Sequence, residues 1–281
     1  MTNFLSAKLK HTLSILLAGC MLLSFTACGD DAPEEPSEPA VPDTPAVEEP
    51  EAPKGDPITP PNISQKMKDA YANNSDTIGW LTVPNTTIDN SVLQTTDNVY
   101  YYRLDENRNY SFPGVFWADY ENTFGERDML SSNTIIYGHN INTNDDKNGV
   151  RFSQLFHYVD KEFAKANPYV FFSTLEEENM AFQIFSTAYT TTAFHYIEVE
   201  NMSSLQFNNF LNEVKLRSEY SFPDVDVNSN DKVIVLSTCS YKLGYPNDDT
   251  RFIVVGKLVP KDAALTTTEN VFDNVNKRTD M

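Results

Sequence analysis

VIVLSTCSYKLGYPNDDTRFIVVGKLV, residues 233–259, holds two apolar runs joined by a polar loop. The first run ends in small hydroxyl residues and Cys239, and Arg251 opens the second. Runs of β-branched and aromatic residues bounded by Asn, Asp, Gly or Pro are typical of strands. We therefore expect two neighbouring strands that place a thiol at the end of one and a guanidinium at the start of the other.

Six further segments show the same strand pattern: GWLTVP (79–84), GVFWAD (114–119), NTIIYG (133–138), YVFFST (169–174), MAFQIFSTAY (180–189) and HYIEVE (195–200). Helices are expected at 63–74, at 152–160 and, longest, at 203–218, just before the Cys239 strand. In the last of these, Ser203 and Gln206 can form a capping box. About eight short strands with few helices predict a mainly β fold, either a barrel or a sandwich.

The charge and the cysteines exclude several classes of protein. The 281 residues carry a net charge of -19, which argues against nucleic-acid binding because phosphates require clustered Lys and Arg. Of three cysteines, Cys20 and Cys28 lie in the N-terminal apolar segment, so Cys239 is the only one in the body. A disulfide framework and a Cys-rich zinc site are therefore excluded, and no cofactor motif or metal site is expected.

Residues 1–28 have the features of an export segment. A basic start precedes residues 12–27, which are mostly apolar but short for a membrane span of about 20 residues. FTACGD (25–30) resembles a lipoprotein processing site, with Cys28 as the lipidation candidate, and an uncleaved membrane anchor is the alternative. Either interpretation places the rest of the chain outside the cytoplasmic membrane, tethered at its N-terminus.

The rest of the chain divides into three parts by composition. Residues 29–61 contain ten of the sixteen prolines and ten acidic residues against one lysine, which predicts a disordered, extended spacer. Residues 62–260 contain the strand and helix patterns and form the expected folded domain. Residues 261–281 are weakly patterned and are expected to be a loose tail.

The loop NDDKNG (144–149) imitates the start of an EF-hand calcium loop. Such a loop needs a bidentate Glu at its twelfth position, which is Leu155 here. We therefore interpret the segment as a polar surface loop.

Cys239 and one histidine are the strongest candidates for chemistry. A thiol becomes nucleophilic as its thiolate, and a nearby imidazole can exchange the proton. Among the histidines, only His139 directly follows a strand pattern, in NTIIYGHN, and precedes a polar loop. Each residue also has a structural interpretation: an inert buried Cys, a polar loop His, and a salt-bridged surface arginine for Arg251. Arg251 nevertheless shares a strand face with the apolar Ile253 and Val255, so its charge needs a polar partner or an edge position.

YGHN, LSTC and TRF, in this order behind an export segment, resemble the motifs of sortases, the cysteine transpeptidases of Gram-positive cell surfaces. Class B is the closer resemblance, because residues 78–105 are similar to the N-terminal barrel region of that class and a long helix precedes the Cys strand. The resemblance covers about residues 62–260. It implies a closed β-barrel of about eight strands with an N-terminal helix and a longer helix before the Cys strand.

The resemblance also implies the roles of three residues and no cofactor. Cys239 would be the nucleophile, His139 the general acid/base, and Arg251 the group that holds the substrate carbonyl and its oxyanion. Val235 stands where the family commonly has Thr, a departure that concerns packing more than chemistry.

The implied partners are surface proteins with a C-terminal sorting motif as acyl donors and an amine of a peptidoglycan precursor as acceptor. The enzyme would act at the extracellular face of the cytoplasmic membrane. Two alternatives remain open from the residues alone: a secreted Cys–His hydrolase that uses water as acceptor, and a non-enzymatic surface lipoprotein in which Cys239 is inert.

Overall fold

The computed structural model of the chain describes residues 55–141, 144–199, 202–245 and 249–280. The expected export segment with Cys28, and most of the expected spacer, lie outside these residues. Within the described part of the chain, no helix combines the length and the apolar character needed to cross a membrane.

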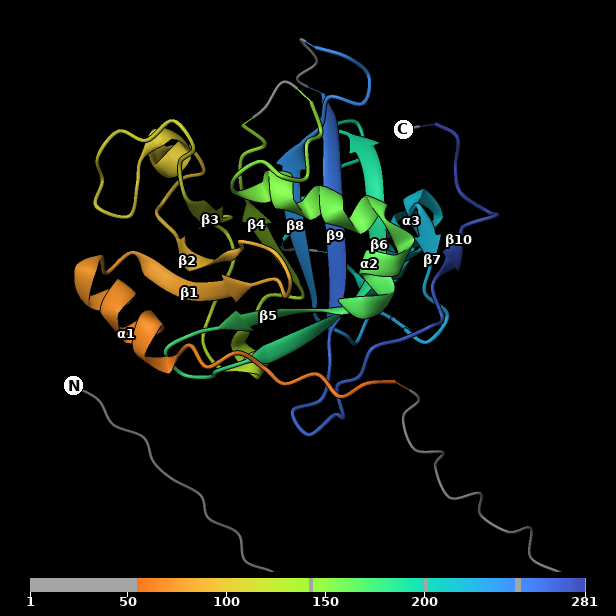
Figure 1. Ribbon diagram of the computed structural model, residues 1–281, viewed down its shortest axis with the longest axis horizontal. Helices are drawn as coiled ribbons and strands as arrows, with labels where there is room; N and C mark the ends of the chain where they lie inside the picture. The colour runs from red at the N-terminus through yellow and green to blue at the C-terminus, as the bar shows by residue number, and fades with distance from the viewer. Residues whose placement is uncertain (1–54, 142–143, 200–201, 246–248, 281) are drawn as a thin grey trace, which may run out of the picture. The chain divides into compact units, whose positions relative to one another are not determined.

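Eight strands close into a barrel in the order β1-β2-β3-β4-β8-β9-β6-β5 (Figure 1). Their bounds are β1 Thr77–Thr82, β2 Asp89–Leu93, β3 Phe116–Ala118, β4 Asn133–Tyr137, β5 Tyr169–Ser173, β6 Met180–Thr191, β8 Val233–Cys239 and β9 Thr250–Leu258. β2 and β3 are parallel, as are β4 and β8, and the other neighbouring strands of the barrel are antiparallel. The prediction of a mainly β fold with a closed barrel of about eight strands is confirmed.

One predicted strand is wrong. Over its described residues, 195–199, the HYIEVE segment forms turns instead of a strand. The side-chain amide of Asn133 donates hydrogen bonds to the carbonyls of Tyr196 (3.1 Å) and Glu198 (2.8 Å). These carbonyls therefore have a side-chain partner in place of a neighbouring strand, while Tyr196 is buried like a strand residue.

β2 is a strand that the sequence pattern did not single out. Its residues, DNSVL, include Asp89 and Asn90, which have low β propensity. The strand forms through its neighbours, antiparallel to β1 and parallel to β3. The indole N–H of Trp80 on β1 also donates to Asp89 at 2.6 Å.

The two shorter predicted helices are present but differ in detail. α1 (Ser64–Asn73) buries Met67 but leaves Tyr71 44% exposed, so its buried face is narrower than expected. The expected helix at 152–160 is a 3-10 helix, Phe152–Val159, followed by α2 (Lys161–Ala166).

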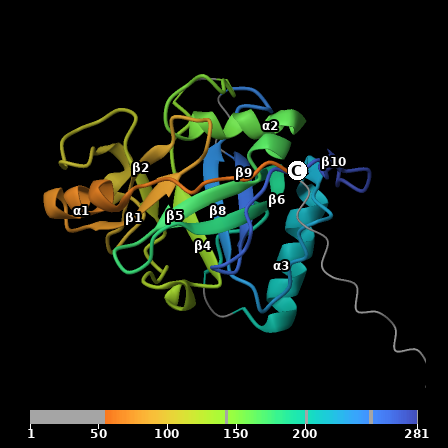
Figure 2. The same cartoon turned by 60° about the horizontal axis from the view of Figure 1, so that its bottom comes forward.

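α3 (Ser204–Arg217) is the predicted long helix and lies along the barrel wall beside β6 (Figure 2). Its buried residues include the expected apolar stripe Phe207, Phe210, Leu211 and Val214. The capping box of Ser203 and Gln206 is present at its start. Each fully buried side chain of this kind stabilises the packed helix by roughly 1.5–3 kcal/mol, so the stripe holds α3 on the sheet.

The C-terminal segment packs against the body, contrary to the expected loose tail. β10 (Phe272–Asp273) pairs with β7 (Tyr220–Ser221), and the side chain of Val271 is only 2% exposed. At its other end the segment pairs with the end of the expected spacer, where Ile58 N–H donates to the Leu265 carbonyl at 2.8 Å. The folded region is therefore longer at both ends than the expected 62–260.

Candidate active site

Strand pairing places Cys239 and Arg251 side by side. They are direct partners in the antiparallel pair β8–β9. The Ser240 N–H donates to the Thr250 carbonyl at 3.0 Å, so those two residues form a hydrogen-bonded pair and the adjacent pair Cys239–Arg251 is of the non-hydrogen-bonded type. Pairs of this type bring their side chains closest, with Cα atoms about 4.5 Å apart. The expected meeting of thiol and guanidinium on neighbouring strands is therefore a direct consequence of register.

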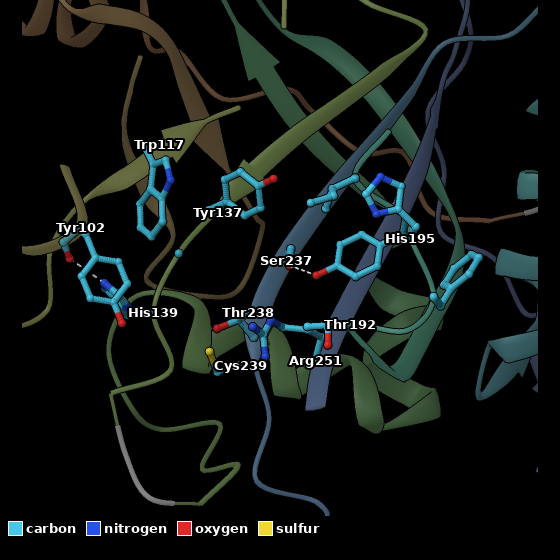
Figure 3. A pocket seen from close by; sticks show the side chains of 14 residues that line it. Tyr102, Trp117, Tyr137, His139, Thr192, His195, Ser237, Thr238, Cys239 and Arg251 are labelled. Carbon is cyan, nitrogen blue, oxygen red and sulfur yellow. Dashed lines mark hydrogen bonds between the residues drawn. The ribbon is translucent and has the colours of Figure 1, made fainter. Parts of the chain in front are cut away.

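Both side chains line a cavity of about 220 Å³ at the ends of β4 and β8 (Figure 3). The thiol of Cys239 is partly exposed, as a nucleophile must be to meet a substrate. The lining is mostly aromatic and polar: Tyr102, Trp117, Tyr137, Gly138, His139, Thr192, Phe194, His195, Tyr196, Ile197, Ser237, Thr238, Cys239 and Arg251.

Arg251 and a buried tyrosine share one wall of this cavity. The Tyr196 hydroxyl and the Ser237 hydroxyl are 2.7 Å apart, and Ser237 lies two residues before Cys239 on the same strand face. Burial raises the pKa of Tyr196, which the Ser237 hydroxyl and the Arg251 guanidinium partly oppose. Arg251 also donates through Nη1 to the Thr250 carbonyl at 3.0 Å. Arg251 therefore has the polar partners that its charge needs on an otherwise apolar strand face.

His139 reaches the same cavity from β4. The parallel register pairs Tyr137 with Ser237, and the Gly138 N–H donates to the Ser237 carbonyl at 3.2 Å. His139 and Cys239 each lie two residues beyond this last β4–β8 pair, so both lie at the same end of these two strands (Figure 1), although β8 stays paired with β9 through Cys239. The structure therefore brings the three residues singled out in the sequence to one cavity.

Gly138 is required where the chain leaves β4. A Cβ atom at this position would lie 2.6 Å from the Phe152 ring and 2.8 Å from the Phe116 ring, distances that real Cβ contacts do not reach. These two rings stack with centroids 4.4 Å apart. A glycine here lets the backbone pass close to the stacked rings and carries His139 into the cavity.

The His139 ring is buried between aromatic side chains and has a defined hydrogen bond. Its side chain is 6% exposed and packs edge-on against the Tyr102 ring, with centroids 4.6 Å apart, and against Trp117. Its Nε2 lies 2.7 Å from the Tyr102 carbonyl oxygen (Figure 3). A carbonyl can only accept, so Nε2 carries the hydrogen and, in the neutral ring, Nδ1 is the nitrogen that can accept a proton.

Burial lowers the pKa of His139 below its usual 6.5, an effect that the Tyr102 carbonyl opposes and that Arg103 and Arg151 reinforce. The imidazole is consequently neutral at pH 7. A neutral ring with one available nitrogen can accept a proton first and return it later, as general acid/base chemistry requires.

The other described histidines differ in position. His157 stacks on Phe163, with centroids 4.9 Å apart, and does not line the cavity. His195 does line it, which the sequence pattern did not indicate, but its side chain is 68% exposed and lies 3.4 Å from the Glu198 carboxylate. Tyr102, Trp117 and Tyr196 were likewise missed as cavity residues, because aromatic residues in a strand-rich sequence are interpreted first as core.

The described residues contain no cluster of three or more His, Cys, Asp or Glu side chains able to hold a metal ion. In the polar loop at 144–149, Asp145 is instead hydrogen-bonded to Ser240 and to the Tyr241 amide. Independently of metals, Cys239, His139 and Arg251 bring a thiol, an imidazole and a guanidinium to the cavity.

Comparison with known proteins gives a consistent result. The Sortase domain family matches residues 81–259. The chain is 37% identical over 199 residues to sortase B of Listeria monocytogenes, an alignment that covers 71% of this chain and 76% of that protein.

Two solved structures share the fold. A Staphylococcus aureus sortase B–substrate complex has a TM-score of 0.61 and 28% identity, covering 70% of this chain and 86% of that one. A sortase B complexed with triglycine has a TM-score of 0.60 and 27% identity, covering 71% of this chain and 88% of that one.

Proposed function

The chain belongs to the sortase family and, within it, to class B, a class of cysteine transpeptidases, and we propose that Cys239, His139 and Arg251 form its catalytic site. Membership of the family implies surface proteins and peptidoglycan precursors as substrates and an association with the cell envelope. The observation that carries the proposal is the convergence of the three residues on one cavity from β4, β8 and β9.

In the first half-reaction, His139 takes the proton of the Cys239 thiol and the sulfur attacks the scissile carbonyl of the sorting motif. The Arg251 guanidinium, next to Cys239 in the sheet, stabilises the oxyanion that forms. His139 then returns the proton to the leaving amine as the peptide bond breaks. The acyl group remains on the sulfur as a thioester, which a second amine can attack.

In the second half-reaction, an amine of a peptidoglycan precursor attacks the thioester. His139 accepts the proton that the amine loses, and the thiolate of Cys239 departs and regains it. The related sortase B complexed with triglycine supports this assignment, since that structure holds a short glycine peptide.

The N-terminal part of the protein completes the proposal. An anchor within residues 1–28, lipidated at Cys28 or retained as an apolar segment, would tether the enzyme to the outer face of the membrane. The Pro- and Glu-rich residues that follow would hold the barrel away from the lipid surface.

A peptide-library cleavage assay with and without an added amine tests the function. We expect cleavage of one sorting motif, a product joined to the amine, and a Cys239-linked acyl intermediate detectable by mass spectrometry. Cys239→Ala should lower turnover by about 10⁴-fold or more, because the covalent route is lost. Cleavage that yields only the hydrolysed acid at every amine concentration would instead support the Cys–His hydrolase, and normal turnover by Cys239→Ala would refute a thiol enzyme.

A further inference from the structure

The loops that follow His139 and Cys239 are joined by one carboxylate. Tyr137 and Ser237 are the last paired residues of β4 and β8; beyond them β8 stays paired with β9 as far as Cys239, but the β4–β8 ladder no longer fixes the separation of the two chains. Asp145, in the loop after His139, accepts hydrogen bonds from both chains just beyond the two catalytic residues. We propose that Asp145 is a positioning residue that sets the distance between His139 and Cys239, an inference that rests on the proposed function of those two residues.

On the Cys239 side, Asp145 has two hydrogen bonds. The Ser240 hydroxyl donates to Oδ2 at 2.7 Å, and the Tyr241 N–H donates to Oδ1 at 2.8 Å. Ser240 is itself fully buried, and its N–H is bonded to the Thr250 carbonyl beside Arg251. Hydrogen bonds to an ionised carboxylate are stronger than neutral ones, so Asp145 holds the residues next to the nucleophile firmly.

On the His139 side, the same carboxylate meets a buried amide. Asn140 donates through Nδ2 to Asp145 Oδ1 at 3.2 Å and accepts from the Ser153 hydroxyl at 2.8 Å. The His139 carbonyl accepts from the Phe152 N–H at 3.0 Å, so the backbone of His139 is tied to the same 3-10 helix. Asn140 and Ser153 are 5% and 0% exposed. An unbroken series of hydrogen bonds therefore joins the residues that follow His139 to the residues that follow Cys239, by way of Asp145.

This link matters because the reaction is sensitive to geometry. The thiol and the imidazole exchange a proton, and a misplacement of about 1 Å between reacting groups can lower a rate about 10²-fold. Strand register fixes Cys239 relative to Arg251 but not relative to His139, which lies beyond the paired part of β4. Asp145 supplies the fixed separation that the sheet no longer provides.

The adjacent Asp146 offers a matched control. Within the described part of the chain, its Oδ1 accepts hydrogen bonds from Asn148, at 2.9 and 3.2 Å, a residue of the same loop and not of the cysteine segment. Asp145→Ala and Asp146→Ala remove the same charge from the same loop, but only the first removes the link. We expect Asp145→Ala to lower kcat about 10- to 100-fold with KM changed by no more than about threefold, and Asp146→Ala to leave both within about twofold.

Two further variants keep the test sound if Asp145→Ala is unstable. Asp145→Asn keeps an oxygen for the Tyr241 N–H but loses the charge, so it should recover part of the lost kcat. Ser240→Ala removes one bond from the opposite side. Combined with Asp145→Ala it should cost little more than Asp145→Ala alone, because both changes break one interaction.

Hydrogen exchange of the Tyr241 amide tests the link without reference to catalysis. We expect exchange at this amide to rise at least about tenfold in Asp145→Ala and to stay unchanged in Asp146→Ala. If the wild-type enzyme transfers no acyl group, the proposed function fails, while the exchange result still reports on the link. The proposal is overturned if exchange at Tyr241 is unchanged in Asp145→Ala, or if the kcat of Asp145→Ala matches that of Asp146→Ala.

Discussion

The Cys239–Arg251 pair and His139 are held in the cavity by different means. Cys239 and Arg251 are partners in a continuous antiparallel ladder whose residues on either side are buried. His139 lies after its strand has ended and is held by remote segments: the Tyr102 carbonyl, the aromatic rings around it, and the 3-10 helix that begins at Phe152.

The difference indicates which part of the site is adjustable. Moving Cys239 relative to Arg251 would require breaking the hydrogen bonds of two core strands. Moving His139 requires only a shift of loop contacts, each worth about 0.5–1.5 kcal/mol as a net hydrogen bond. Substitutions around His139 should therefore change activity at nearly constant stability, whereas substitutions within β8 and β9 should change both.

The largest effect is expected from His139 itself. His139→Ala removes the proposed acid/base and should lower turnover about 10²- to 10⁴-fold, while the melting temperature changes little because the strands remain paired. His195→Ala is the matched control, since that ring lines the same cavity but is mostly exposed. Turnover and melting temperature are measured on the same samples. An active His139→Ala together with a folded but inactive His195→Ala would reverse the assignment.

Substitutions of Arg251 test the Cys239–Arg251 pair, whose geometry is fixed by the register of β8 and β9. Arg251→Ala should lower turnover about 10²- to 10³-fold through loss of an oxyanion donor, with thiol labelling of Cys239 near normal. Arg251→Lys should recover little, because a point charge does not reproduce the planar fork of donors. If Arg251 is only structural, the Ala variant will melt at a lower temperature and remain fully active per folded molecule.

A substitution at Gly114 should displace the His139 ring slightly without removing it. Gly114 has φ +59°, and a Cβ atom there would lie 3.1 Å from both the His139 ring and the Tyr102 carbonyl oxygen. Gly114→Ala should push the ring from its hydrogen bond and lower turnover about tenfold, given the sensitivity of rates to small displacements. Gly244→Ala is the control, with φ +96° but open space around the new methyl. Equal losses in the two variants would point to backbone strain and not to the displacement of His139.

The smallest effect concerns pH. Because burial lowers the pKa of His139, the ring stays neutral below pH 6.5. In the pH profile of kcat/KM, the acidic limb, where activity is lost as His139 becomes protonated, should therefore lie below that value. Tyr102→Ala uncovers the ring while keeping the backbone carbonyl, so the pKa of His139, and the acidic limb with it, should move up toward 6.5. Tyr102→Phe keeps the ring contact and should leave the limb in place. A limb that moves to lower pH in Tyr102→Ala would show that burial is not the cause.

Elements with local signals could be predicted from the amino-acid order. Apolar runs indicated seven of the eight barrel strands, and an apolar stripe with a capping box indicated α3. Cys239 and Arg251 could be placed at facing strand ends because strands that follow each other along the chain are usually neighbours in the sheet. The motifs around His139, Cys239 and Arg251 were sufficient to indicate the family before any coordinates.

Features that depend on distant partners emerged only in the folded chain. The HYIEVE segment has the pattern of a strand, but the Asn133 side chain donates hydrogen bonds to the carbonyls of Tyr196 and Glu198. The polar β2 segment lacks that pattern and yet forms a strand, because it pairs with β1 on one side and β3 on the other. The C-terminal segment carries weak patterns and is held by β7 and by the residues before α1.

The same distinction applies to the site. Alternation along a strand reports which face a side chain occupies, so the thiol and the guanidinium were predictable. The Tyr102 carbonyl that orients His139, and the carboxylate of Asp145 that links the two loops, act across 37 and 95 residues of chain. Such contacts form only when the closed barrel brings its loops together, and no periodicity within a short window records them.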